Sequence, residues 1–113
     1  MCEIRWFDNY EDCIKFFGQI AKNDGEELTP NYCFEGNSGT TFEWVMDVAK
    51  IVGWDNIGVT KRDYENDSNS FCDEIFIRIK DIEKFKKGSA CLDADEVDLY
   101  SNDEGIYIRI WWD

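Results

Sequence analysis

Histidine is absent from this chain of 113 residues, and proline occurs only once. Without histidine, the usual Ser–His and Cys–His pairs of nucleophilic catalysis cannot form. Carboxylates would then have to act as bases. Glycosidases work with paired carboxylates, but they need a deep sugar cleft, for which so short a chain leaves little room. We therefore expect no enzymatic activity and no cofactor.

Basic side chains are also scarce, since 12 Lys and Arg face 25 Asp and Glu, for a net charge of -13. A field of that sign repels nucleic acid and anionic membranes, and it attracts basic protein surfaces or cations. The imbalance predicts a basic protein partner, with no direct contact to nucleic acid and none to a membrane.

Long apolar runs are missing as well, because no stretch approaches the roughly 18 residues that span a bilayer. The first residues, Met1 to Trp6, lack the basic flank and apolar run of a signal peptide. We expect a cytoplasmic protein. Hydrophobic residues make up 43% of the chain and aromatic ones 16%, so the high charge does not predict disorder. Residues 1–113 are expected to form a single domain.

The cysteines are odd in number and widely spaced, with no CxxC pair; they stand at positions 2, 13, 33, 72 and 91. Structural zinc sites use closely paired ligands, so we expect no metal site. Cys13 and Cys72 are expected to be small, reduced core residues.

Two segments have the apolar spacing of amphipathic helices. The first covers about 10–23, with Asp8 or Asn9 as its cap and Gly25 after its end. The second is expected to begin in Thr40-Thr41-Phe42-Glu43, where a hydroxyl and a carboxylate have capping-box spacing, and to end at Gly53 in a left-handed cap.

Alternating apolar residues predict strands, and glycine or polar stretches predict the loops between them. We expect strands at 2–7, 57–60, 71–80, 97–100 and 106–112, loops at 26–39 and 61–70, a helical turn at 81–87, and a five-residue hairpin loop at 101–105. The segment 74–79 resembles 105–110, which indicates two neighbouring strands with matched faces. The fold class expected is α+β, an antiparallel sheet of about five strands with two main helices packed on one face.

Two loops have partial resemblance to ligand-binding motifs. The segment 35–41 leads into a helix but lacks the GK[ST] ending of a phosphate loop, so a loop with a helix cap is preferred. The window 63–74 has oxygen side chains at several calcium-loop positions, but no glycine at its sixth position and a strand where a helix should follow. We interpret it as a solvated turn.

The outer sheet face is expected to carry Phe76, Tyr107 and Trp111 between Arg78 and Arg109. Such a face could stack single-stranded nucleic acid, but the net charge argues against it. Cross-strand cation–π pairing, or burial under a loop or a second subunit, explains the same residues. A homodimer through this face remains an alternative.

The carboxylates occur in clusters, and their excess is comparable to a short piece of DNA. A duplex carries one phosphate per 1.7 Å of axis, so the net charge matches about 22 Å of DNA. In size, charge and α+β build the chain resembles anti-CRISPR and antirestriction proteins of phages and other mobile elements. This resemblance implies an inhibitor that imitates DNA in a basic protein of the bacterial host: a CRISPR effector, a restriction enzyme or a nuclease toxin.

The expected phosphate mimics bracket the terminal hairpin: Asp93, Asp95, Glu96, Asp98, Asp103 and Glu104. The second choice is Asp63, Glu65 and Asp67, and Tyr107 and Trp111 are expected to supply apolar anchors. Two alternatives remain open. An immunity protein against a nuclease toxin would share the acidity, and a dimerising structural module would use the acid only for solubility.

Overall fold

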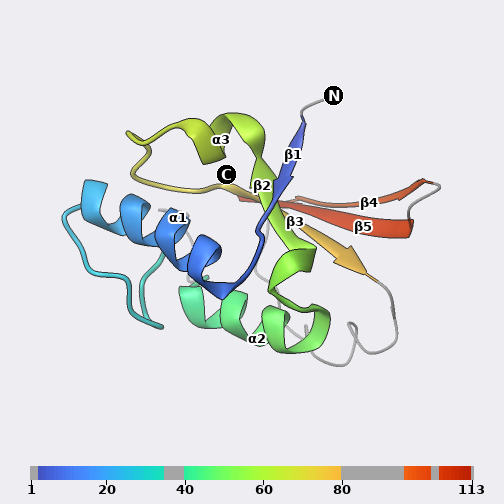
Figure 1. Ribbon diagram of the computed structural model, residues 1–113, viewed down its shortest axis with the longest axis horizontal. Coiled ribbons are helices and arrows are strands. Elements are labelled where there is room, and N and C mark those ends of the chain that lie inside the picture. Colours follow the sequence, from blue (N-terminus) through green and yellow to red (C-terminus); the bar gives the residue numbers. More distant parts are fainter. Residues whose placement is uncertain (1–2, 35–39, 80–95, 103–104, 113) are drawn as a thin grey trace.

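The computed structural model describes residues 3–34, 40–79, 96–102 and 105–112 (Figure 1). Helices and strands alternate irregularly along the chain. In order they are β1 (Ile4–Trp6), α1 (Tyr10–Asn23), α2 (Phe42–Val52), the 3-10 turn η1 (Trp54–Asn56), β2 (Ile57–Thr60), α3 (Lys61–Glu65), β3 (Glu74–Ile79), β4 (Glu96–Asn102) and β5 (Gly105–Trp111). The α+β class with an antiparallel sheet is confirmed.

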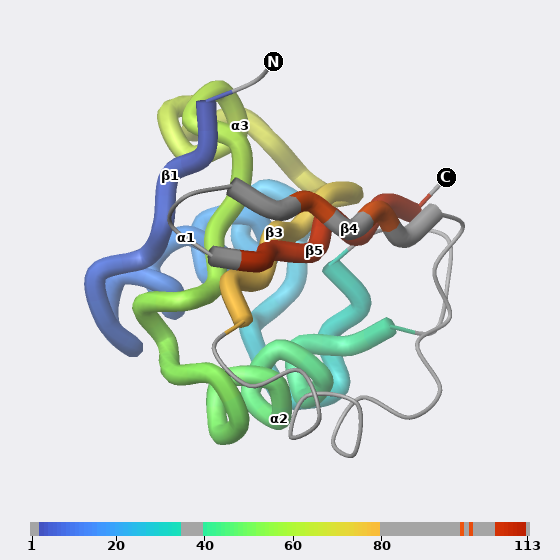
Figure 2. The backbone as a smooth tube through the Cα atoms, turned by 90° about the vertical axis from the view of Figure 1, so that its right-hand side faces the viewer, coloured from blue at the N-terminus to red at the C-terminus, as the bar shows by residue number. Residues whose placement is uncertain are grey.

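The strands form one sheet in the order β1-β2-β3-β5-β4, in which all neighbours are antiparallel. β3 pairs with β5 along its whole length, with Ile77 opposite Ile108 and Phe76 opposite Arg109. The predicted pairing of the two similar segments is therefore confirmed. Figure 2 shows β3, β5 and β4 next to one another, with α2 to one side of them.

The core lies between the sheet and the two longer helices. α1 buries Phe17 and Ile20 there, α2 buries Val45 and Val48, and β3 contributes Ile77. Because these side chains form one cluster, α1 and α2 cover the same sheet face (Figure 1). Cys13 and Cys72 are buried and free, as predicted.

The helix N-termini test the caps that the sequence predicted. Asn9 caps α1 by accepting a hydrogen bond from the Asp12 backbone N–H at 2.9 Å, as predicted. The capping box at α2 is wrong: the cap residue is Thr41, and it makes no side-chain cap bond. Instead, the backbone N–H of Phe42 donates to the Tyr32 carbonyl, and that of Glu43 donates to the Pro30 carbonyl, at 2.9 Å each. A distant loop thus satisfies amides that the sequence assigned to a local side chain.

Gly53 ends α2 with φ +92°, so the expected positive φ is confirmed. Its ψ of 149° departs from the left-handed helical cap that the sequence predicted. The Gly53 N–H still donates to the Ala49 carbonyl at 2.8 Å, which closes the helix.

The predicted loop at 61–70 is wrong in its first half, where α3 forms. The Thr60 hydroxyl accepts a hydrogen bond from the Asp63 N–H at 3.1 Å, which is the bond of a helix N-cap. This short helix places Tyr64 against Arg5 of β1 and Phe16 of α1.

Other boundaries shifted by a few residues. β1 and β3 are shorter than predicted, and β4 continues to Asn102 while β5 begins at Gly105, so the expected loop at 101–105 was too long. The helical turn expected at 81–87 lies outside the described residues. Among the described residues, no helix has the length and apolar character needed to cross a membrane.

Candidate protein-binding surface

Most of the residues that the sequence predicted as the first choice of phosphate mimics lie outside the described part of the chain. Asp93, Asp95, Asp103 and Glu104 lie outside the described residues, and Glu96 is described only as the first residue of β4.

Asp98 lies within the described residues, and its carboxylate is paired with Arg109. It lies opposite Arg109 in the β4–β5 register and accepts a hydrogen bond from Arg109 Nη1 at 2.9 Å. Arg109 Nε also donates to the Glu74 carboxylate. Arg109 therefore forms ion pairs with two acids on the outer sheet face, Glu74 and Asp98. Because its charge is partly neutralised, the Asp98 carboxylate is less available to a basic partner than the sequence predicted.

The outer sheet face is covered by its own side chains. The Arg78 guanidinium lies over the Trp6 ring, with Cζ 4.6 Å from the ring centroid, and it also donates to Asn56 Oδ1 at 2.8 Å. Phe76, on the same face, is only 5% exposed. With both arginines held in the chain, this face is poorly suited to bind a nucleic-acid backbone. The ring that Arg78 covers is Trp6 of β1, which is not one of the aromatic residues that the sequence predicted for this pairing.

The two expected anchors, Tyr107 and Trp111, are half-buried on this face. The Tyr107 ring stacks on Tyr100, with centroids 5.3 Å apart, and forms a T-shaped pair with Trp6, with centroids 6.4 Å apart. Tyr107 therefore packs mainly against its own sheet.

The acids of the second choice, Asp63, Glu65 and Asp67, lie in and just after α3. Asp63 and Glu65 belong to α3, and Asp67 follows it in a loop that the Asn23 side chain holds against the end of α1. Asn23 Nδ2 donates to the backbone carbonyls of Asp67 and Asn69, at 2.7 Å each. Among the described residues, none of these three carboxylates takes part in an ion pair.

A second acidic segment adjoins the first at the end of α1. Asp24, Glu26 and Glu27 directly follow Asn23 and are exposed. The Tyr32 hydroxyl donates to Asp24 at 3.2 Å, and no ion pair holds the three carboxylates within the described part of the chain. We call the two segments together the acidic edge: Asp24, Glu26, Glu27, Asp63, Glu65 and Asp67. Of the two segments, the sequence predicted only Asp63, Glu65 and Asp67 as contact residues, and the Asn23 contact reveals that the two segments are neighbours.

Sequence reasoning missed a network around Tyr64, because it placed this residue in a loop. The Tyr64 hydroxyl donates to Asp12 Oδ1 at 2.6 Å, and this bond is the main reason that the pKa of Tyr64 is raised. The Arg5 guanidinium lies over the Tyr64 ring and also approaches Asp12 and Asp8. The spacing of Thr60 and Asp63 was the signal that could have predicted α3 and hence this contact.

The described residues also bear on metal binding and on cysteine reactivity. No group of three or more His, Cys, Asp or Glu side chains that could hold a metal ion comes together in them. Burial raises the pKa values of the Cys13 and Cys72 thiols, which disfavours the nucleophilic thiolate.

The comparisons with known proteins add no further constraint. No protein-family model, no curated protein sequence and no solved structure matches this chain.

Proposed function

We propose that this protein is an acidic inhibitor that occupies the nucleic-acid site of a basic host protein by imitating phosphate charge. The partner belongs to the class of CRISPR effectors, restriction enzymes or nuclease toxins. The observation that carries the proposal is the acidic edge, where two acidic segments with no ion pairs among the described residues lie next to each other. The net charge of -13 supplies the long-range attraction.

We place the proposed contact at the acidic edge and not at the terminal hairpin. Asp98 bonds to Arg109, whereas Asp67 and Glu65 make no side-chain bonds within the described residues. Free carboxylates attract a basic groove more strongly than paired ones, because an internal cation already cancels much of the field of a paired acid.

The test uses purified enzymes of the partner class: a Cas9-type effector, restriction endonucleases and a ribonuclease toxin. Nucleic-acid cleavage is measured with increasing amounts of this protein, and the mass of each mixture is measured at about 50 and about 300 mM NaCl. We expect a complex with at least one enzyme, inhibition of its cleavage, and an affinity that falls steeply as salt rises.

Matched triple variants locate the contact. Asp63→Asn, Glu65→Gln and Asp67→Asn together should weaken the complex about 10-fold or more. Glu11→Gln, Glu43→Gln and Asp55→Asn remove the same charge elsewhere and should change affinity by less than about 3-fold. The proposal fails if no enzyme of the panel binds even at low salt.

A further inference from the structure

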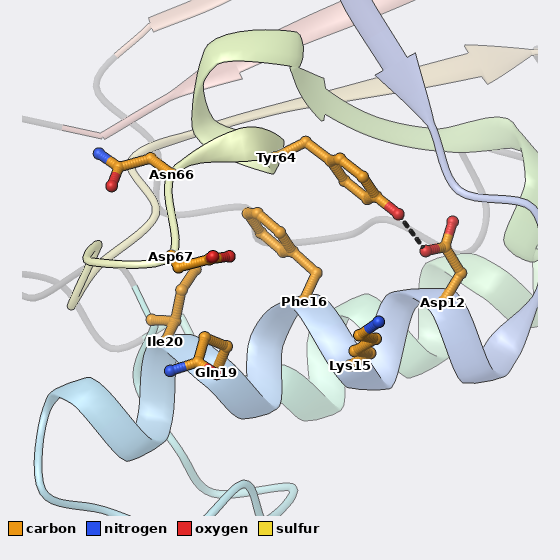
Figure 3. A pocket seen from close by; sticks show the side chains of 8 residues that line it. All are labelled: Asp12, Lys15, Phe16, Gln19, Ile20, Tyr64, Asn66 and Asp67. Carbon is orange, nitrogen blue, oxygen red and sulfur yellow. Dashed lines mark hydrogen bonds between the residues drawn. The ribbon is translucent and has the colours of Figure 1, made fainter.

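A small pocket lies between α1 and the segment that follows Tyr64, beside the acidic edge (Figure 3). Its volume is about 160 Å³, which is below the roughly 300–1,000 Å³ of typical small-molecule sites. It is large enough for one side chain. Its walls include Asp12, Lys15, Phe16, Gln19, Tyr64 and Asp67.

Two parallel aromatic rings contribute to the pocket. Phe16 and Tyr64 have ring planes within 2° of each other and centroids 6.1 Å apart. Phe16 is buried and Tyr64 is half-buried, so their positions are set by packing. Flat ring surfaces of this kind suit a planar cation or the methylene stem of a long basic side chain.

The molecule already binds one guanidinium with two of these residues. Arg5 places its Cζ 4.5 Å from the Tyr64 ring centroid, and its Nη2 lies 3.6 Å from Asp12 Oδ2. Tyr64 and Asp12 therefore show, within the chain itself, the ring and carboxylate combination that holds an arginine.

Asp67 contributes a second carboxylate to the pocket, in addition to Asp12. The Asp67 carboxylate makes no hydrogen bond or ion pair among the described residues, while its backbone carbonyl is tied to Asn23. Gln19 Nε2 donates to Asn23 Oδ1 at 2.9 Å, which leaves the Gln19 carbonyl oxygen as an acceptor. The Asp67 carboxylate and the Gln19 carbonyl oxygen are thus hydrogen-bond acceptors held at fixed backbone positions. An arginine side chain has enough N–H groups to donate to both at once.

Among the described residues that line the pocket, Lys15 is the single cation, and it is exposed. It makes no ion pair within the described part of the chain, so its long side chain can turn toward solvent. Its charge opposes a bound cation and therefore offers a test: removing it should strengthen binding.

We propose that this pocket receives an arginine side chain of the partner protein, as the specific anchor beside the less specific attraction of the acidic edge. The inference rests on the proposed function for its partner, but its chemistry can be tested without one. Arginine is favoured over lysine because its planar head can lie against a ring while it donates to Asp67 and Gln19 together.

The experiment titrates the ¹⁵N-labelled protein with nona-arginine and, separately, nona-lysine at about 100 mM NaCl. Backbone shifts are followed by NMR, and affinity is measured by calorimetry. We expect the largest shifts with nona-arginine at residues of the pocket, among them Phe16, Gln19 and Tyr64. Nona-lysine should bind more weakly and shift these residues less.

Single-charge variants give the matched comparison. Asp67→Asn should lower the affinity for nona-arginine about 3-fold, and Lys15→Gln should raise it by a similar factor. Glu43→Gln removes one exposed carboxylate from α2 and should leave affinity almost unchanged. Folding of each variant is checked by its NMR spectrum.

The pocket assignment is overturned if shifts spread over all acidic segments, if Asp67→Asn and Glu43→Gln act equally, or if both peptides shift the pocket equally. The proposed function would survive those outcomes, since the acidic edge could still bind a nuclease. Conversely, pocket-specific arginine binding without inhibition of any enzyme in the panel would overturn the proposed function and leave the arginine site.

Discussion

At the scale of single residues, packing in the folded chain changes the pKa of several side chains. Tyr32 is an example: its ring is buried, and its hydroxyl reaches Asp24 at the end of α1. Burial is the main cause that raises the pKa of Tyr32 to about 12, and the negative charge of Asp24 adds to it. The neutral phenol is therefore favoured in the folded state.

This shift predicts a loss of stability at alkaline pH. The unfolded chain releases the Tyr32 proton near its ordinary pKa of about 10, while the folded chain keeps it up to about 12. The stabilisation is fully present below pH 10 and is lost as pH rises toward 12. Tyr32→Phe should make the urea unfolding free energy fall less steeply above pH 10.

Tyr10→Phe is the control, because it removes the hydroxyl of an exposed ring. An equal change of slope in the two variants would contradict the assignment to Tyr32.

At the scale of single residues, prediction from sequence succeeded where the role of a side chain depends only on the residues near it in the chain. Asn9 caps α1, and Cys13 is buried, because both follow from local spacing. It was less successful for Asp98, whose charge depends on Arg109 across a strand pair. No local pattern states which acid a distant arginine will meet.

At the scale of elements, the short strand β1 is held in place by its approach to β2. Gly58 pairs with Trp6, and a Cβ on Gly58 would lie 2.8 Å from the Arg5 carbonyl oxygen and 2.9 Å from Trp6 Cε3. The backbone oxygen cannot easily move, since it belongs to the paired strand. A side chain at this position would push β1 away from the sheet.

Two glycine variants are therefore expected to act in opposite directions. Gly58→Ala should lower the free energy of unfolding by about 1–3 kcal/mol through this overlap. Gly18→Ala lies in α1, where a Cβ meets nothing within 4 Å, and should raise it by about 0.5–1 kcal/mol. Urea denaturation of both variants checks this, and a loss at Gly18 equal to that at Gly58 would show that the contact is not responsible.

Long periodic elements were predictable, and their ends were less so. α1 has the predicted range and α2 agrees within two residues at its start, because each has a continuous apolar stripe over several turns. α3 was missed because five residues are too few to show periodicity. The start of α2 depends on carbonyls of Pro30 and Tyr32, which are spatial and not sequential neighbours of its cap.

At the scale of the whole molecule, the net charge of -13 repels itself within a fold whose Cα radius of gyration is 13.2 Å. Unfolding spreads the charges apart and relieves this repulsion. Salt should therefore stabilise the folded state by screening it.

The melting temperature should rise by about 3–5 °C between roughly 20 and 300 mM NaCl, as measured by circular dichroism. Sodium bromide at the same ionic strength should give a similar rise, because screening depends on ionic strength more than on the anion. A melting temperature that stays constant or falls with both salts would contradict net self-repulsion.

The amino-acid sequence by itself determined the sign of the surface charge, the absence of histidine chemistry and the positions of the long helices and strands. These follow from sums over residues or from local periodicity. Only the tertiary structure decided which carboxylates are free, because Arg109 reaches Asp98 across the sheet and Asn23 holds the loop of Asp67 beside Asp24. Pairing of charges and closure of a pocket depend on distances between remote residues, and those distances exist only once the chain has packed.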